Sequence, residues 1–120
     1  MSDGQQRRRK AYARGHGAET RAALFLMLKG YRVLARRYKT PLGEIDLIAR
    51  RGRRIVFVEV KQRPTVELCE ASVTDETRRR VRRAAGWWMG RHPQLHDFDQ
   101  GFDLVFIANW RWPVHLHNAL

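Results

Sequence analysis

Apolar and polar residues alternate along two neighbouring stretches near the middle of the chain, and this pattern predicts a β-hairpin. The stretches are residues 44–49 and 55–61, and a basic segment with one glycine, residues 51–54, joins them. A connection of this length that contains a glycine is typical of hairpins. Pairing Arg50 with Ile55 aligns the two stretches and fixes the register of the whole hairpin.

Side chains of a strand point alternately to its two faces, so this register sorts the hairpin residues into two sets. One set is wholly apolar and is expected to face a core: Ile45, Leu47, Ala49, Val56, Val58 and Val60. The other set combines four charged side chains with two apolar ones: Glu44, Asp46, Glu59, Lys61, Ile48 and Phe57. Asp46 is expected to lie directly across from Glu59.

The rest of the chain predicts an α/β fold, a mixed sheet with a helix on each side. We expect a helix over residues 17–29 that ends at Gly30, a strand over 31–38, a loop over 65–72, a helix over 74–89, a buried strand over 101–108 and a last edge strand within 110–116. The 101–108 stretch is almost continuously apolar and follows a helix, which is typical of a parallel strand. In the second helix, Trp88 is expected in the core and Trp87 partly exposed.

The charge of the chain favours a polyanionic partner. It contains 24 lysine and arginine residues against 12 acidic ones, which gives a net charge of +12. Such an excess repels itself and contributes nothing to folding, so nucleic acid is the expected partner. Residues 1–14, with a basic run at 7–10, are expected to form a flexible basic arm, and residues 15–120 a single domain.

Arginines crowd one short part of the second helix. Five occur in six positions: Arg78, Arg79, Arg80, Arg82 and Arg83. We interpret them as contacts to a nucleic-acid backbone, with an ordinary solvated helix face as the alternative. Arg63, at the end of the central hairpin, is expected either to reach a phosphate or to lie in solvent.

Several other classes of protein fit the sequence poorly. Cys69 is the only cysteine, which excludes a disulfide framework and a thiolate zinc cluster. The longest apolar run, residues 22–28, is too short to span a bilayer, and no signal peptide follows the basic start. We therefore expect a soluble, cytoplasmic protein with no membrane partner. The histidines are expected to bind no metal, although His16 lies too far into the arm to judge. Asp103 is expected to be structural, with an indirect role in supporting the site as the alternative.

Asp46 and Glu59 form the candidate site. Like charges across a sheet repel, and burying them costs free energy unless a cation compensates. A divalent metal ion beside Lys61 would supply that cation, and salt bridges to arginines are the alternative. Glu19 heads the apolar stripe of the first helix and points toward the core, although a favourable interaction with the helix dipole would also explain it.

The arrangement of Asp46, Glu59 and Lys61 resembles the D…E-x-K motif of the PD-(D/E)XK nuclease superfamily, with Ile45 where the motif has proline. This superfamily has the restriction-endonuclease-like fold. The resemblance implies an αβββαβ core with a mixed central sheet flanked by helices.

A closer resemblance is to the small bacterial YraN family (UPF0102). It rests on GEIDLIAR at residues 43–50 and VFVEVKQR at 56–63, and extends to Gly15 with Glu19, to residues 102–105 and to the ending 117–119. These segments together span most of the chain.

The two resemblances imply a metal-dependent nuclease that hydrolyses phosphodiester bonds. Asp46, Glu59 and Glu19 would hold Mg²⁺ (or Mn²⁺), and Lys61 would complete the catalytic set. DNA is favoured over RNA as the substrate, with branched or structured DNA a candidate. The alternative is a nucleic-acid-binding protein that does not cleave, and a homodimer is an option because a second copy could complete the site.

Overall fold

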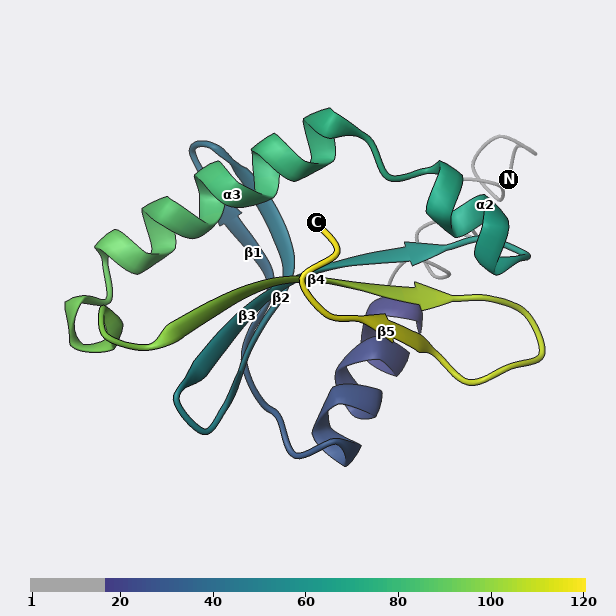
Figure 1. Ribbon diagram of the computed structural model, residues 1–120, viewed down its shortest axis with the longest axis horizontal. Coiled ribbons are helices and arrows are strands. Elements are labelled where there is room, and N and C mark those ends of the chain that lie inside the picture. Colours follow the sequence, from purple (N-terminus) through teal and green to yellow (C-terminus); the bar gives the residue numbers. More distant parts are fainter. Residues whose placement is uncertain (1–16) are drawn as a thin grey trace, which may run out of the picture.

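The computed structural model describes residues 17–120, in which five strands form one mixed sheet in the order β1-β2-β3-β4-β5 (Figure 1). The strands are β1 (Arg32–Thr40), β2 (Gly43–Arg51), β3 (Arg54–Gln62), β4 (Asp99–Ile107) and β5 (Val114–Leu116). Strands β1, β2 and β3 are antiparallel, β4 runs parallel to β3, and β5 is antiparallel to β4. The predicted basic arm lies outside the described residues.

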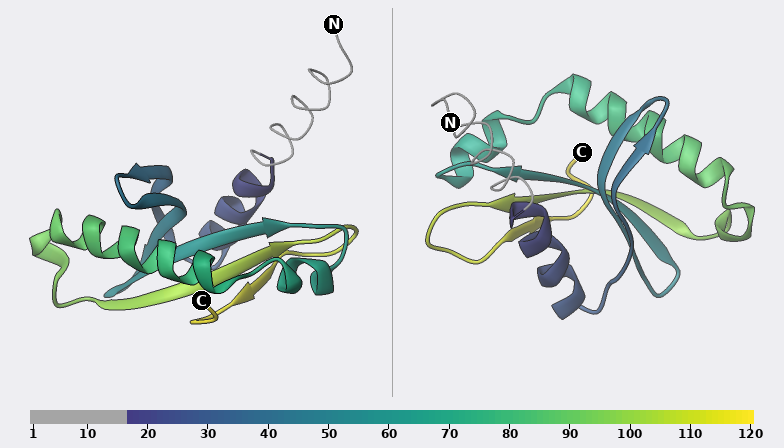
Figure 2. Two further views of the ribbon diagram at one scale, coloured as in Figure 1. Left: turned by 90° about the horizontal axis from the view of Figure 1, so that it is seen from above. Right: turned by 180° about the vertical axis from the view of Figure 1, so that it is seen from behind.

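Helices cover both faces of this sheet (Figure 2). The first helix, described over residues 17–28, packs on one face, whereas α3 (Asp75–Gly90) and the shorter α2 (Val66–Ala71) pack on the other. A single 3₁₀ turn, η1 (Pro93–Leu95), connects α3 to β4. The predicted αβββαβ order and the parallel pairing of the 101–108 strand are confirmed. Among residues 17–120, no helix has both the length and the apolar character needed to cross a membrane.

The predicted loop over residues 65–72 is wrong, because most of it is helix α2. Thr65 caps this helix by accepting a hydrogen bond from the Leu68 amide at 3.2 Å, and Cys69 is its one buried residue. A helix of six residues with one core contact is too short to show helical periodicity in the sequence. Thr74 caps α3 in the same way, accepting from the Thr77 amide.

The predicted hairpin register is confirmed, since Arg50 pairs with Ile55 and Ile48 with Phe57. Apart from Ile45, the hairpin residues divide between the two faces as predicted, but the expectation that only one face forms a core is wrong, because both faces are buried. Ile48 and Phe57 belong to a second core under α3, where the rings of Phe57 and Trp88 lie 5.7 Å apart. Trp87 is partly exposed, as predicted.

Ile45 also lies in the core under α3, not with Leu47 and Ala49 on the other face as predicted. The alternation of strand β2 is therefore broken at Asp46. The pairing of β2 with β3 ends at Leu47 and Val58, so the two strands separate next to the acidic residues. This opening of the sheet positions the candidate site.

Candidate active site

Asp46 lies where β2 separates from β3, and its carboxylate bonds to the β3 backbone where the backbone pairing of the two strands has ended. Its Oδ2 atom accepts a hydrogen bond from the backbone N–H of Val60 at 2.8 Å. Burial and the nearby charge of Glu59 raise the pKa of Asp46 to about 7, although the Val60 N–H and Arg80 favour the ionised form. The structure therefore brings Asp46 and Glu59 together, as the register predicts, and the charge of Glu59 disfavours the ionised form of Asp46.

Glu59 is buried, with 5% of its surface exposed, and two cations contact its carboxylate. The Arg80 Nη2 atom donates to Oε2 at 2.7 Å, and the Lys61 Nζ atom lies 3.4 Å from Oε1. Lys61 is held close to the strand, with 17% of its side chain exposed. The salt bridges that the sequence offers as an alternative to a metal ion thus form at Glu59.

Arg80 reaches Glu59 from α3 by passing over Gly43. A Cβ atom at residue 43 would lie 2.5 Å from Cγ of Arg80, and the backbone φ of Gly43 is +133°, a region that L-residues avoid. Glycine at this position is therefore what allows the arginine to enter. The Arg80 Nε atom is buried without a hydrogen-bond partner among the described residues, which leaves one donor unpaired beside the site.

Glu19 is buried at the start of the described part of the first helix, but arginines of β1 surround it. Arg36 donates from Nε to Oε1 at 3.0 Å, and Arg37 lies 3.5 Å from Oε2. Arg37 also lies 3.7 Å from Glu44, so it stands between two acids. Among residues 17–120, Glu19, Asp46 and Glu59 do not form a group whose ligand atoms all lie within 4.8 Å of one another.

The arginines of α3 differ in their surroundings. The first turn of the helix supplies acids to three of them: Arg78 pairs with Asp75, and Arg79 and Arg83 pair with Glu76. Three of the five predicted phosphate contacts therefore have acidic partners on their own helix.

Two further predicted phosphate contacts also have internal partners. Arg82 donates to the carbonyl oxygen of Leu120 at 2.7 Å and stacks over Phe102. Arg63 is exposed at the end of β3 and donates to the carbonyl oxygen of Gln62 at 2.7 Å. Arg63 therefore stays accessible near Lys61.

A second polar cluster, which sequence reasoning missed, surrounds Asp103. His115 Nε2 lies 2.8 Å from Oδ2 of Asp103, and the Asn118 N–H donates to Oδ1 at 2.9 Å. The Lys29 ammonium donates to Nδ1 of the same histidine at 2.6 Å. His117 completes a group of three potential ligands, with Nδ1 3.9 Å from Oδ2 of Asp103.

This cluster suits a structural role better than a metal ion. Burial alone would raise the pKa of Asp103, but the hydrogen bonds from His115 and Asn118 outweigh it and hold the pKa below its usual value. Lysine has only donors, so Nδ1 of His115 accepts and Nε2 carries the proton toward Asp103. A metal ion at Nε2 would have to displace that proton in the presence of the Lys29 charge.

Comparison with known proteins confirms the resemblance to the UPF0102 family. The model of the "Uncharacterised protein family UPF0102" matches residues 18–107. A UPF0102 protein of Rhizobium meliloti is 51% identical over 94% of this chain and 93% of its own length. UPF0102 proteins of Mesorhizobium japonicum and Methylorubrum populi are 51% and 52% identical, over 93% and 98% of this chain and 90% and 94% of their own lengths. The chain belongs to the UPF0102 family.

Proposed function

We propose that this chain is a metal-dependent nuclease of the restriction-endonuclease-like superfamily that hydrolyses phosphodiester bonds in DNA. The observation that carries the proposal is the meeting of Asp46 and Glu59 where β2 and β3 separate, with Lys61 3.4 Å from Glu59. An acidic pair beside a lysine is the set of groups that metal-assisted phosphodiester hydrolysis requires.

The donor atoms fit Mg²⁺ or Mn²⁺. Both metals prefer oxygen ligands, which the carboxylates of Asp46 and Glu59 and the carbonyl group of Val60 would provide. Burial and the charge of Glu59 raise the pKa of Asp46, so a metal ion between the two carboxylates would favour the ionised form of Asp46. Glu19 stays a predicted third acid of the site, and its ion pairs with Arg36 and Arg37 would have to yield to the metal.

A bound metal ion would lower the pKa of a water molecule and neutralise charge on the scissile phosphate. The residues of the chain have separate roles. Glu59 holds the Lys61 ammonium in place, so Lys61 can stabilise the negative charge that develops on the phosphate. Arg80 limits the repulsion between the two acids and presents an unpaired Nε–H group nearby. Arg63, which is exposed directly after β3, would contact an adjacent phosphate.

One observation favours the alternative, a nucleic-acid-binding protein that does not cleave. Arg80 and Lys61 already neutralise Glu59, so the fold does not require a metal ion at that residue. On this alternative, the charged face would serve only to hold β3 against α3.

Cleavage of labelled linear, flapped and four-way-junction DNAs in Mg²⁺, Mn²⁺ or EDTA tests the proposal. We expect metal-dependent products from the wild type and a loss of turnover of about 100- to 1,000-fold in Lys61→Ala. DNA affinity should stay within a few-fold, because Lys61 acts on charge that develops in the transition state. Lys39→Ala is the matched control, since Lys39 is exposed on β1.

The alternative replaces the proposal if the wild type cleaves none of these DNAs, nor RNA, while binding them. Equal cleavage by Lys61→Ala and the wild type would remove Lys61 from the mechanism. A homodimer that completes the site, which the small size of the chain favours, would be detected by sedimentation equilibrium. We propose the cytoplasm as the location, because the DNA of a bacterial cell lies there.

A further inference from the structure

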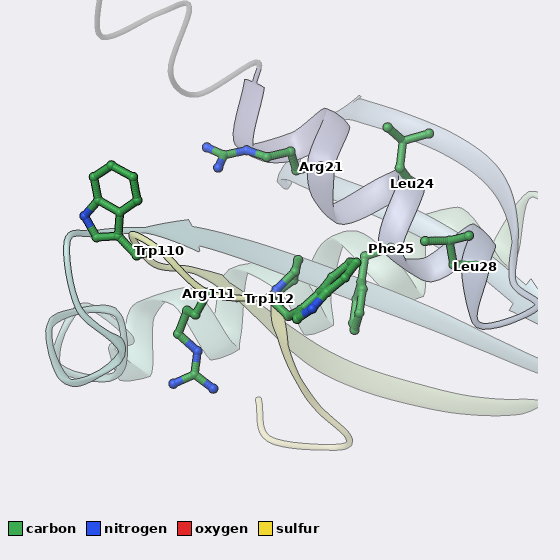
Figure 3. A pocket seen from close by; sticks show the side chains of 8 residues that line it. Arg21, Leu24, Phe25, Leu28, Trp110, Arg111 and Trp112 are labelled. Carbon is green, nitrogen blue, oxygen red and sulfur yellow. The ribbon is translucent and has the colours of Figure 1, made fainter.

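An apolar groove lies between the first helix and the segment that follows β4 (Figure 3). It encloses about 490 Å³. Leu24, Phe25 and Leu28 of the helix line one side, and Trp110 and Trp112 line the other. This volume is within the range of pockets that bind small organic groups.

The two tryptophans are unusually exposed. Trp110 is 100% exposed and Trp112 is 75% exposed, so two large aromatic surfaces face water at one site. Trp112 lies beside Phe25, with ring centroids 6.4 Å apart and planes tilted by 37°. Trp110 has a positive φ of 63°, a region that residues other than glycine seldom adopt. The indole of Trp110 therefore lies in solvent at the edge of the groove.

The positive charge of the groove indicates which kind of molecule it can bind. Arg21 and Arg111 line it, no acidic residue does, and the whole chain carries a charge of +12. A second copy of this chain would place arginines against arginines, because a two-fold interface brings the same surface from both partners. An occupant with flat apolar faces and negative charge satisfies both features. Unpaired nucleotides have that chemistry, because their bases stack on aromatic rings while phosphates contact arginine.

The groove and the candidate active site lie at the same end of the sheet. Strand β4 follows β3 in parallel up to the pairs Lys61 with Phe106 and Gln62 with Ile107. Beyond them the Arg63 N–H donates to Ile107 and the Asn109 N–H donates to Pro64, each at 3.2 Å. The segment that carries Trp110 therefore leaves the sheet next to the strand end that carries Lys61 (Figure 1).

We propose that this groove binds unpaired nucleotides of a DNA strand by stacking on Trp110 and Trp112. It follows that the substrate carries a single-stranded segment, such as an overhang or a flap, next to the bond that is cleaved. This statement about the substrate rests on the proposed nuclease function, whereas the binding itself does not.

Fluorescence anisotropy in EDTA measures the binding without cleavage. The probes are a labelled oligothymidylate of about ten nucleotides and a duplex of equal length. We expect the double variant Trp110→Ala, Trp112→Ala to bind the single strand about 10- to 100-fold more weakly, and the duplex within about twofold of the wild type. Both residues are exposed, so the variant should keep its melting temperature.

Matched variants separate stacking from mere apolar contact. Replacing both tryptophans by phenylalanine should retain most of the single-strand affinity, whereas replacing both by leucine should lose it, because leucine has no aromatic face. Trp87→Phe, on α3 and outside the groove, is the control and should bind as the wild type does.

Undiminished single-strand affinity in the alanine variant would overturn the proposal. An equal loss of affinity for the duplex would do so as well, because stacking requires unpaired bases. If sedimentation equilibrium shows that the wild type is a dimer and the alanine variant is a monomer, the groove is an interface between two copies of the chain, and the nucleotide-binding proposal is wrong. If the protein binds single strands selectively but never cleaves, the groove proposal stands and the proposed nuclease function is wrong. If the protein cleaves DNA equally well with and without the two tryptophans, the nuclease function stands and the groove proposal is wrong.

Discussion

At the scale of single residues, Asp46 links the stability of the fold to pH. Its pKa of about 7 lies above the ordinary value of 3.8, because of burial and the neighbouring Glu59. Between these two values the folded chain binds more protons at Asp46 than the unfolded chain does. The free energy of unfolding contributed by this group is therefore fully present at low pH and lost as pH rises through about 7.

We predict that Asp46→Asn removes this pH dependence and, at pH about 8 in EDTA, raises the free energy of unfolding by about 1–3 kcal/mol. The asparagine keeps an oxygen that can accept the Val60 N–H. Urea unfolding at several pH values between about 4 and 8 measures the effect. The control is Glu67→Gln, at an exposed position on α2, which should leave the pH dependence unchanged. If the free energy of unfolding of Asp46→Asn depends on pH as that of the wild type does, Asp46 is not the titrating group.

Asp103 has the opposite pH dependence, because its pKa is held below the ordinary value. Its contribution to stability is present above pH about 4 and is lost as pH falls through the folded-state pKa. We predict that Asp103→Asn lowers the free energy of unfolding at pH 7 by about 2–4 kcal/mol, since it removes a buried charge that His115 and Asn118 stabilise.

The control for Asp103 is Asp97→Asn, an exposed acid paired with Arg53, for which a change below about 0.5 kcal/mol is expected. Thermal or urea unfolding compares the two variants. Equal stability of Asp103→Asn and the wild type would show that the cluster with His115 does not hold β5 and the C-terminal residues in place.

At the scale of elements, the β2–β3 hairpin could be predicted from the sequence, but the residues from other elements that contact its charged side chains could not. Period-two alternation and the length of the turn suffice to fix the pairing of Arg50 with Ile55, because both are local. The cation at Glu59 is not local, since Arg80 lies 21 residues away among five arginines that look equivalent in the sequence. Gly43 was the available signal, because only glycine allows a side chain to pass so closely over β2.

The same limit applies to the other long-range contacts. Lys29 and His115 are separated by 86 residues and meet only because β5 pairs with β4. Strand β4 contains no lysine, arginine or histidine, so nothing near Asp103 in the sequence indicates which residue compensates its buried charge. The break in the alternation at Asp46 was also hidden, because it arises where the pairing of β2 with β3 ends.

The link between α3 and β3 yields a prediction for Arg80. Arg80→Ala removes the nearest cation from buried Glu59, so the free energy of unfolding in EDTA should fall by about 2–4 kcal/mol. Adding Mg²⁺ should restore more stability to this variant than to the wild type, because the metal then has no competing guanidinium at Glu59. Urea unfolding with and without Mg²⁺ measures both changes.

Arg79→Ala is the matched control for this element, since Arg79 is exposed and pairs with Glu76 on its own helix. It should cost less than about 0.5 kcal/mol and respond to Mg²⁺ as the wild type does. A destabilised Arg80→Ala that gains nothing extra from Mg²⁺ would place any metal ion away from Glu59.

At the scale of the whole molecule, the net charge of +12 comes from arginines in different surroundings, some packed on aromatic rings and others in exposed ion pairs. Arginines at the β2–β3 turn pack against aromatic rings: Arg50 and Arg53 lie over Phe98, and Arg51 lies over Tyr31, each at 4.6 Å. The side chains of Arg78, Arg79 and Arg83 on α3 are 41%, 62% and 53% exposed, and their ion pairs within residues 17–120 are with acids in the first turn of their helix. Such pairs contribute little to stability, so these three arginines can turn to phosphates at low cost.

The last prediction follows from this difference. Each phosphate that an arginine neutralises adds about 0.9 to the slope of log affinity against log salt concentration. Replacing Arg78, Arg79 and Arg83 together by alanine should therefore flatten the slope by about 2–3 and weaken binding similarly on DNAs of different sequence. Replacing Arg50, Arg51 and Arg53 removes the same net charge and should flatten the slope less. Equal slopes for the two triple variants would mean that DNA responds to total charge and not to α3.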